Sequence, residues 1–131
     1  MKLKTSELTG SALDYSVAIA KGIPSADLKL PSYKGDSLFR YIRDDEGELT
    51  GNYMTGPDLL FSRKWEAAGP IIEKEQFSIA APSPINKCWT AMTWRNESKQ
   101  DGPTLLIAAM RCYVQSKLGD EVEIPNKIAK F

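Results

Sequence analysis

The strongest structural signal in the sequence is one stretch near its end, DGPTLLIAAMRCYVQSKLG, residues 101–119. Pro near the first helical position and Gly just after the last are typical of a helix start and end, so we expect a helix between Pro103 and Gly119. Its apolar residues leave only a narrow polar face, which indicates a helix covered on most sides. The residues that we expect to be buried are Leu106, Ala109, Met110 and Tyr113.

Two further helices are predicted upstream. One runs from about Ser11 to Lys21, is capped by Thr9 or Ser11, and ends before Gly22 and Pro24. The spacing of its apolar residues predicts a packed face made of Leu8, Ala12, Tyr15 and Ile19. A shorter helix is expected to begin at Gly69-Pro70, because Pro suits the first position of a helix.

Strand signals lie between these helices. Alternating, aromatic or β-branched residues occur over 2–5, 38–43, 77–81, 88–94 and 121–124. The acidic segment at 44–48 separates the second of these from Leu49 and is typical of a hairpin turn.

Two tryptophans, Trp89 and Trp94, decide the predicted architecture. They lie an odd number of positions apart on one predicted strand. Because successive side chains of a strand alternate between its two faces, they point to opposite faces of the sheet unless a bulge intervenes. A sheet with apolar side chains on both faces needs cover on both. We therefore predict an α+β protein, an α/β/α sandwich in which two main helices and one short helix cover a mixed sheet of about five strands.

Length and composition indicate a single domain, residues 1–131. The chain is 42% hydrophobic and 26% charged, which is typical of a globular protein, and it is long enough for one core. It has no His and only Cys88 and Cys112, which excludes imidazole-dependent metal sites and a four-cysteine zinc site. We expect both thiols to be buried and inert. We also expect no metal, no cofactor and no catalytic residues, because no nucleophile is evident together with its base.

The charges balance, with 17 Lys and Arg against 17 Asp and Glu. Phosphate binding usually requires a basic excess, so we expect no specific nucleic-acid binding. The longest apolar run, residues 105–110, is far too short to span a membrane. The sequence therefore favours a cytosolic protein with reduced thiols and no membrane partner.

Motifs in three parts of the chain point to a family. They are KTSELTG and ALDY at 4–10 and 12–15, Trp65 with GPIIE at 69–73, and GPT, LIAAMRCYV and SKLGDEVE at 102–104, 106–114 and 116–123. Together they resemble the NinX-like proteins of lambdoid phages and prophages, small accessory proteins without an assigned activity. The resemblance implies a phage or prophage accessory protein in the host cytoplasm. Where the family pattern has a Tyr-Ser-Thr-Asp-Trp type of segment, this chain has FSRKW at 61–65, so two cations replace Thr and Asp.

Four residues are candidates for binding a ligand or a partner: Trp65, Arg63, Lys64 and Arg111. Trp65, beside two cations, is the tryptophan that we expect to be partly exposed, whereas the other two are expected in the core. Arg111 lies in the most apolar helix, where an unpaired charge costs several kcal/mol. Two interpretations stay open: the guanidinium pairs with a carboxylate or extends to the polar face of the helix, or it faces an anion-binding pocket.

These observations favour a non-enzymatic protein that acts by binding a host or phage protein. One alternative is a small-ligand protein that binds or sequesters a nucleotide-like anion through Arg and aromatic contacts. Another is an enzyme of unrecognised type. A deep pocket lined by Arg and aromatic side chains would favour the ligand, and an exposed apolar patch would favour the protein partner.

Overall fold

The computed structural model describes residues 1–54, 59–95 and 97–129. Its helices are α1 (Gly10–Ala20), α2 (Trp65–Glu75), α3 (Leu105–Leu118) and α4 (Asn126–Ala129), with short 3-10 turns η1 (Thr5–Glu7) and η2 (Ser25–Asp27). Its strands are β1 (Lys2–Lys4), β2 (Leu28–Lys29), β3 (Phe39–Arg43), β4 (Leu49–Tyr53), β5 (Ser78–Ala80), β6 (Trp89–Met92), β7 (Lys99–Gly102) and β8 (Glu121–Glu123).

The strands form three small sheets. β1 pairs with β8, β3 lies between β2 and β4, and β6 lies between β5 and β7. The α+β class is confirmed, but the single mixed sheet of about five strands is a wrong prediction, because every pairing in the described ranges is antiparallel and no sheet there exceeds three strands. The first and last predicted strands pair with each other and do not join the others.

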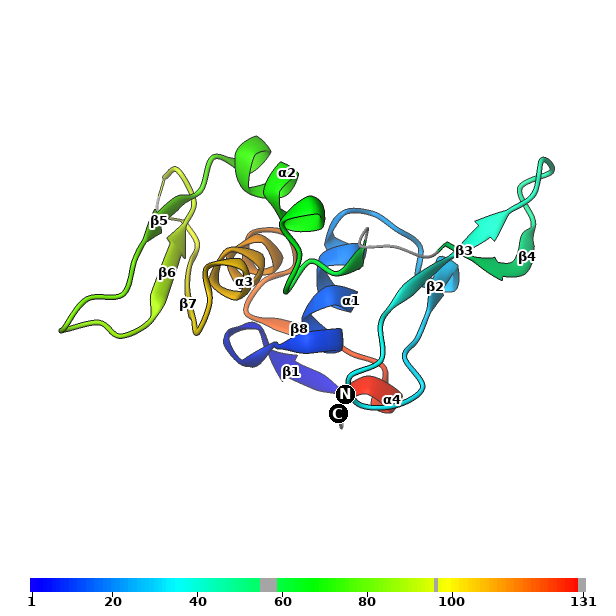
Figure 1. Cartoon of the computed structure of the whole chain (residues 1–131), viewed down its shortest axis with the longest axis horizontal. Coiled ribbons are helices and arrows are strands. Elements are labelled where there is room, and N and C mark those ends of the chain that lie inside the picture. The colour runs from blue at the N-terminus through cyan, green and yellow to red at the C-terminus, as the bar shows by residue number, and fades with distance from the viewer. Residues whose placement is uncertain (55–58, 96, 130–131) are drawn as a thin grey trace.

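The helices lie between the sheets (Figure 1). α3 packs against β6 and β7 on one side and against α1 and α2 on others, while β2, β3 and β4 extend away beyond α1. The predicted sandwich, with a sheet between helices, is therefore corrected to helices between small sheets.

Trp94 explains this error. β6 ends at Met92, and Trp94 follows in a turn, so the strand alternation does not reach it. Trp94 is 71% exposed, so its expected position in the core is wrong. Trp89 is half-buried against the core, as expected. The sheet of β5, β6 and β7 has its cover on the face where α3 packs.

The strongest sequence prediction is confirmed in α3. The Thr104 side chain caps the helix by accepting from the Ile107 backbone N–H at 3.1 Å, so Pro103 lies just before the cap and not in the first turn. Gly119 ends the helix with φ +96°, which glycine adopts without steric cost. The four residues expected to be buried are buried: Leu106, Ala109, Met110 and Tyr113.

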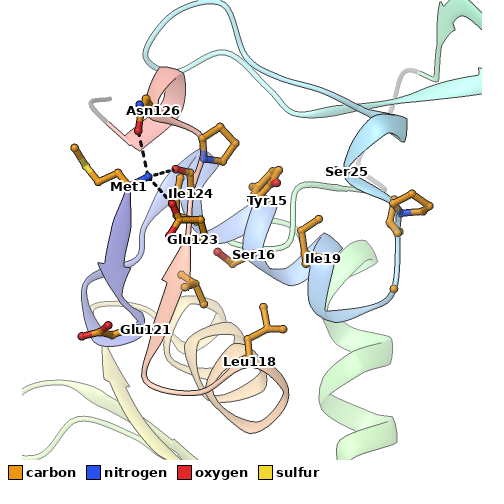
Figure 2. Close-up of a pocket in the computed structure, with 15 residues that line it drawn as sticks. Met1, Tyr15, Ser16, Ile19, Ser25, Leu118, Glu121, Glu123, Ile124 and Asn126 are labelled. Atoms are coloured by element: carbon orange, nitrogen blue, oxygen red, sulfur yellow. Dashed lines mark hydrogen bonds and ion pairs between the residues drawn. The ribbon is translucent and has the colours of Figure 1, made fainter.

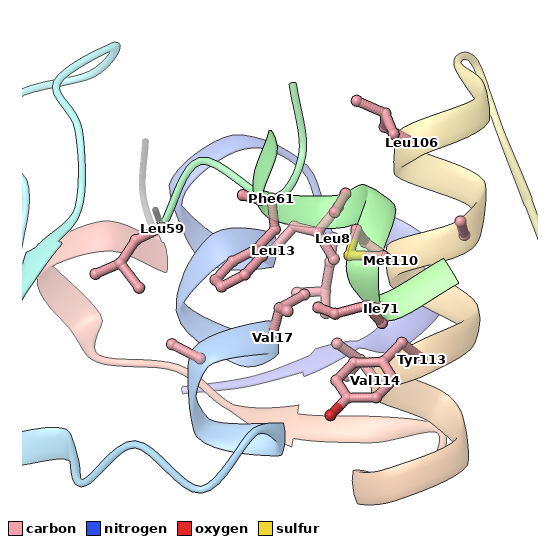
Figure 3. Close-up of a cluster of buried hydrophobic side chains, with 14 of the residues drawn as sticks. Leu8, Leu13, Val17, Leu59, Phe61, Ile71, Leu106, Met110, Tyr113 and Val114 are labelled. Atoms are coloured by element: carbon pink, nitrogen blue, oxygen red, sulfur yellow. The ribbon is translucent and has the colours of Figure 1, made fainter. Parts of the chain in front are cut away.

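α1 has nearly the predicted bounds but a different packed face. Leu13 and Val17 are fully buried and point into the core with Phe61, Ile71 and Met110 (Figure 3). Leu8 is buried as predicted, whereas Ala12, Tyr15 and Ile19 are only half-buried. The buried face of α1 is therefore shifted by one residue from the predicted face. The small residues Ser16 and Ala18 are also buried, although an apolar spacing pattern does not select them.

α2 begins before the predicted start at Gly69-Pro70. Its first residue is Trp65, and Pro70 lies inside the helix. Pro70 has no N–H to donate to the carbonyl four residues earlier, which belongs to the exposed Glu66, where water can replace the lost bond. Burial of Ala67, Ala68 and Ile71 in the core favours the helix in spite of that loss.

Candidate functional site

A hairpin arm, residues 39–53, projects from the body of the protein (Figure 1). It consists of β3, an acidic turn and β4, and the predicted turn is confirmed. The backbone N–H of Asp44 donates to the Glu48 carbonyl at 2.8 Å, and Gly47 adopts φ +81°. The Asp44 carboxylate also accepts from the backbone N–H groups of Glu46 and Glu48, which is the local bonding that favours Asp in turns. The turn is therefore fixed by its own residues.

An ion pair that sequence reasoning missed anchors the arm. Asp27, in η2, is buried, and its Oδ1 lies 2.6 Å from Nη2 of Arg43. Arg40 adds a longer contact at 3.9 Å. The hydrogen bond from Arg43 holds the pKa of Asp27 below its usual value. Because the two residues lie 16 positions apart, no local pattern in the sequence pairs them.

One face of the arm is aromatic and partly open to solvent. Tyr41 lies opposite Tyr53 and Arg43 opposite Leu49, and residues directly opposite on antiparallel strands share a face. The rings of Phe39 and Tyr53 are 5.1 Å apart. All of β4 is exposed, with Leu49 at 40% and Tyr53 at 41%, and in the described part of the chain β4 pairs only with β3. The arm thus presents apolar side chains and an unpaired strand edge together.

The tip of the arm is strongly acidic. Its turn carries four exposed carboxylates within five residues, Asp44, Asp45, Glu46 and Glu48. The cations nearest in sequence, Arg40 and Arg43, pair with Asp27, and Nη1 of Arg43 also donates to the Gly47 carbonyl within the turn. The four carboxylates themselves form no ion pair with the described residues and face solvent.

Three of the predicted binding residues lie together at the start of α2. Trp65 is the first residue of the helix and is 57% exposed, which confirms the expected partial exposure. Lys64 is exposed as well, and Nη2 of Arg63 donates to Ser37 Oγ at 3.1 Å. That these three residues bind something stays a prediction.

Arg63 also lines a cavity of about 430 Å³ beside the start of α1, and this cavity contains a residue that sequence reasoning missed. The Asp14 carboxylate is buried and accepts the backbone N–H of Ser62 at 2.8 Å. Burial raises the pKa of Asp14 to about 6, against the opposing effect of the Ser62 hydrogen bond. An Asp within a helix is ordinarily exposed, so the sequence carries no signal for its burial.

Arg111 lies apart from the other three predicted residues. Its side chain is 9% exposed, and it donates from Nε to the Leu8 carbonyl and from Nη1 to the Asp101 carbonyl, both at 2.8 Å. Of the interpretations left open by the sequence, a carboxylate pair is not found: within the described residues, no carboxylate lies within ion-pair distance of this guanidinium. Two backbone carbonyls from separate segments take that place.

A more open cavity of about 920 Å³ lies between α1, β8 and the segment at 22–25 (Figure 2). Tyr15, Ile19 and Leu118 supply much of its apolar wall. At its edge the amino group of Met1 donates to Oε1 of Glu123 at 3.0 Å. The predicted combination of Arg with aromatic side chains is not found among the described residues that line it.

Two further features bear on the class of protein. Across the described ranges, no three potential ligands among Asp, Glu and Cys gather closely enough to hold a metal ion. Within the same ranges, none of the helices has the length and apolar character needed to cross a lipid bilayer.

The sequence was compared with known families and proteins. The family model described as bacteriophage P22 NinX matches residues 4–117. The match covers most of the chain, including the segments at 25–60 and 77–100 that lie outside the motifs quoted above. No curated protein matches the chain significantly.

Proposed function

Because this chain belongs to the bacteriophage P22 NinX family, we propose that it is a phage accessory protein that acts in the host cytoplasm by binding another protein, through the hairpin arm. One observation carries the proposal. The arm projects from the body, exposes Leu49 and Tyr53 in part, and has a strand edge at β4 to which no other strand pairs within the described residues. Contiguous exposed apolar surface in a folded protein often marks a protein interface.

The residue types on the arm support a protein partner. Tyr is among the residues that contribute most to protein interfaces, and Tyr41 and Tyr53 lie side by side on the aromatic face. An unpaired edge such as β4 can also accept a strand from a partner, whose backbone groups then complete the sheet. The arm thus offers both side-chain and backbone contacts.

The acidic tip indicates which charge the binding surface of the partner carries. Four exposed carboxylates repel a phosphate backbone and attract Lys and Arg, so the arm fits a protein with an apolar groove or strand edge bordered by basic residues. Charge complementarity of this kind speeds association and excludes acidic partners.

The test is a comparison of two variants as bait. Leu49→Ser with Tyr53→Ser removes the apolar side chains of β4, while Trp94→Ser removes an exposed aromatic side chain from a different part of the surface. Each tagged protein is captured from phage-infected cells, and bound proteins are quantified by mass spectrometry. We expect a protein that wild type and Trp94→Ser retain and the arm variant loses. Identical recovery with all three baits would refute the proposal.

A further inference from the structure

Arg111 opens onto a pocket that the proposed function does not use. This Arg111 pocket has a volume of about 450 Å³ and lies where η1, β7 and α3 meet, with Ser6, Cys88, Lys99 and Asp101 among its lining residues. Cavities of this size are typical of small-molecule sites.

The guanidinium of Arg111 has unused donors at this pocket. A guanidinium carries five N–H groups, and the hydrogen bonds to Leu8 and Asp101 use Nε and Nη1. Nη2 makes no hydrogen bond to the described residues. Among those residues, every side-chain nitrogen that is fully buried has a hydrogen-bond partner, so a nitrogen without a partner must be in contact with solvent. Nη2 is therefore accessible, and Arg111 lines the pocket.

The positive charge of Arg111 is also without a counter-ion in the described part of the chain. The carboxylate of Asp101 accepts from the Thr90 hydroxyl at 2.7 Å, and the Arg111 bond goes to the Asp101 backbone carbonyl instead. Lys99 brings a second cation to the same pocket and Asp101 brings one carboxylate, so the residues that line it carry one net positive charge. A buried charge is costly unless it is paired, which makes an anion the complementary ligand.

We propose that the Arg111 pocket binds the phosphate group of a small molecule. Arg111 is held in place by two carbonyl groups from separate segments, so its remaining donors are oriented before the ligand arrives. Lys99 supplies the second charge that suits a dianion, and the exposed hydroxyl of Ser6 supplies a further donor. A phosphate can come from inorganic phosphate or from a phosphate monoester, and the two sources share this chemistry.

Cys88 offers a direct reading of whether the pocket is occupied. Its thiol is exposed and lines the pocket, so the expectation that both thiols are buried is wrong for Cys88 and confirmed for Cys112. Alkylation of the folded protein by iodoacetamide therefore reports on Cys88, with Cys112 as an internal control that reacts only on unfolding. A phosphate bound beside Cys88 blocks the approach of the reagent.

The experiment measures the rate of Cys88 alkylation by mass spectrometry with inorganic phosphate, AMP or adenosine, at ionic strength matched with NaCl. For a dissociation constant of about 1 mM, phosphate at about 10 mM slows the reaction about tenfold by mass action. We expect protection by phosphate, by AMP or by both, and none by adenosine. Stronger protection by AMP would identify a monoester as the natural form.

Two variants assign the protection to the pocket. Lys99→Gln should reduce the protection of Cys88 by phosphate at least about threefold. Mass action produces such a reduction when the dissociation constant for phosphate rises by a similar factor. Lys74→Gln, an equal loss of charge on the exposed surface of α2, should leave it unchanged. Absence of protection by both phosphate and AMP, equal protection by adenosine, or full protection in Lys99→Gln would each overturn the proposal. These results are independent of the hairpin arm, which the variants do not touch.

Discussion

α3 and the hairpin arm use similar side chains for opposite purposes. Both contain apolar residues and tyrosine, yet Tyr113 in α3 is 7% exposed and Tyr53 in the arm is 41% exposed. α3 is packed by α1, α2 and three strands, β6, β7 and β8, whereas β4 in the arm pairs with β3 alone within the described chain. For these two tyrosines, the number of elements that pack around the segment decides how far the side chain is buried. We expect α3 to determine stability and the arm to determine binding.

The largest effect should come from a charge placed in α3. Ala109→Glu puts a carboxylate at a fully buried position, which should cost about 4 kcal/mol or more and unfold the domain. The matched change in the arm, Asn52→Glu, lies on an exposed strand and should shift the free energy of unfolding by less than about 0.5 kcal/mol. Urea denaturation of both proteins measures the difference. A folded Ala109→Glu with the wild-type midpoint would contradict the assignment of α3 as the core.

A somewhat smaller loss is expected from Arg111→Met. The change removes the donors to the carbonyls of Leu8 and Asp101, and unsatisfied carbonyl groups should lower the free energy of unfolding by about 2–4 kcal/mol. Met fills part of the apolar space but donates nothing. Thermal melting without added anions checks this, and an unchanged melting temperature would show that the two hydrogen bonds do not stabilise the fold.

Two buried aspartates, Asp14 in α1 and Asp27 in η2 at the base of the arm, should respond to acid in opposite ways. Folding raises the pKa of Asp14 to about 6, so its ionised form opposes folding, and the protein gains stability as pH falls from 7 toward 4. In the arm, Arg43 lowers the pKa of Asp27, so the stability that this ion pair contributes persists down to about pH 4 and is lost below it.

Asp14→Asn isolates the first of these effects. The amide keeps an oxygen that can accept from Ser62, but it carries no charge. At pH 7 the variant should be as stable as wild type or more stable, by up to about 2–3 kcal/mol, and it should lose the gain on acidification. Denaturation curves between pH 4 and 7 measure both quantities. A variant that is less stable at pH 7 and keeps the wild-type pH dependence would be inconsistent with a buried carboxylate of raised pKa.

The smallest effect on stability should come from the arm. Leu49→Ser together with Tyr53→Ser removes side chains that are already partly in water, so the melting temperature should change little and the free energy of unfolding by less than about 1 kcal/mol. The same variant should lose the partner. If the variant unfolds instead, these two side chains stabilise the fold as core residues do, and the proposed contrast between the arm and α3 is wrong.

Features set by local interactions could be predicted from the sequence, and features set by tertiary contacts could not. The bounds of α3 were predictable because Thr104, Gly119 and an unbroken apolar run act locally, and the turn of the arm was predictable for the same reason. The interior position of Pro70 was not, since burial of Ile71 in the tertiary structure outweighs the local preference of Pro for a helix start. Nor was β7, whose polar residues KQDG carry no strand signal and owe their conformation to pairing with β6.

The same distinction between local and distant interactions applies to the residues of the candidate sites. Exposure of Trp65 was predictable from its cationic neighbours, which cannot be buried without partners. The partners of Arg111 were not predictable, because Leu8 lies 103 residues away and offers only a backbone carbonyl, a group that every residue has. Asp14 was missed for a related reason: its burial depends on Ser62, 48 residues later.

The pairing of β1 with β8 sets a kinetic requirement on folding. Lys2 lies opposite Glu123 and Thr5 bonds to the carbonyl of Asp120, so this sheet forms only after almost the whole chain has closed into a loop. Such distant contacts cost loop-closure entropy before they stabilise anything, and chains that depend on them fold in milliseconds to seconds and not in microseconds. α3 can form early from its own sequence, whereas docking of the first strand must come late. During synthesis on the ribosome, β1 would therefore wait unpaired until β8 emerges, because Glu123 lies 122 positions after Met1.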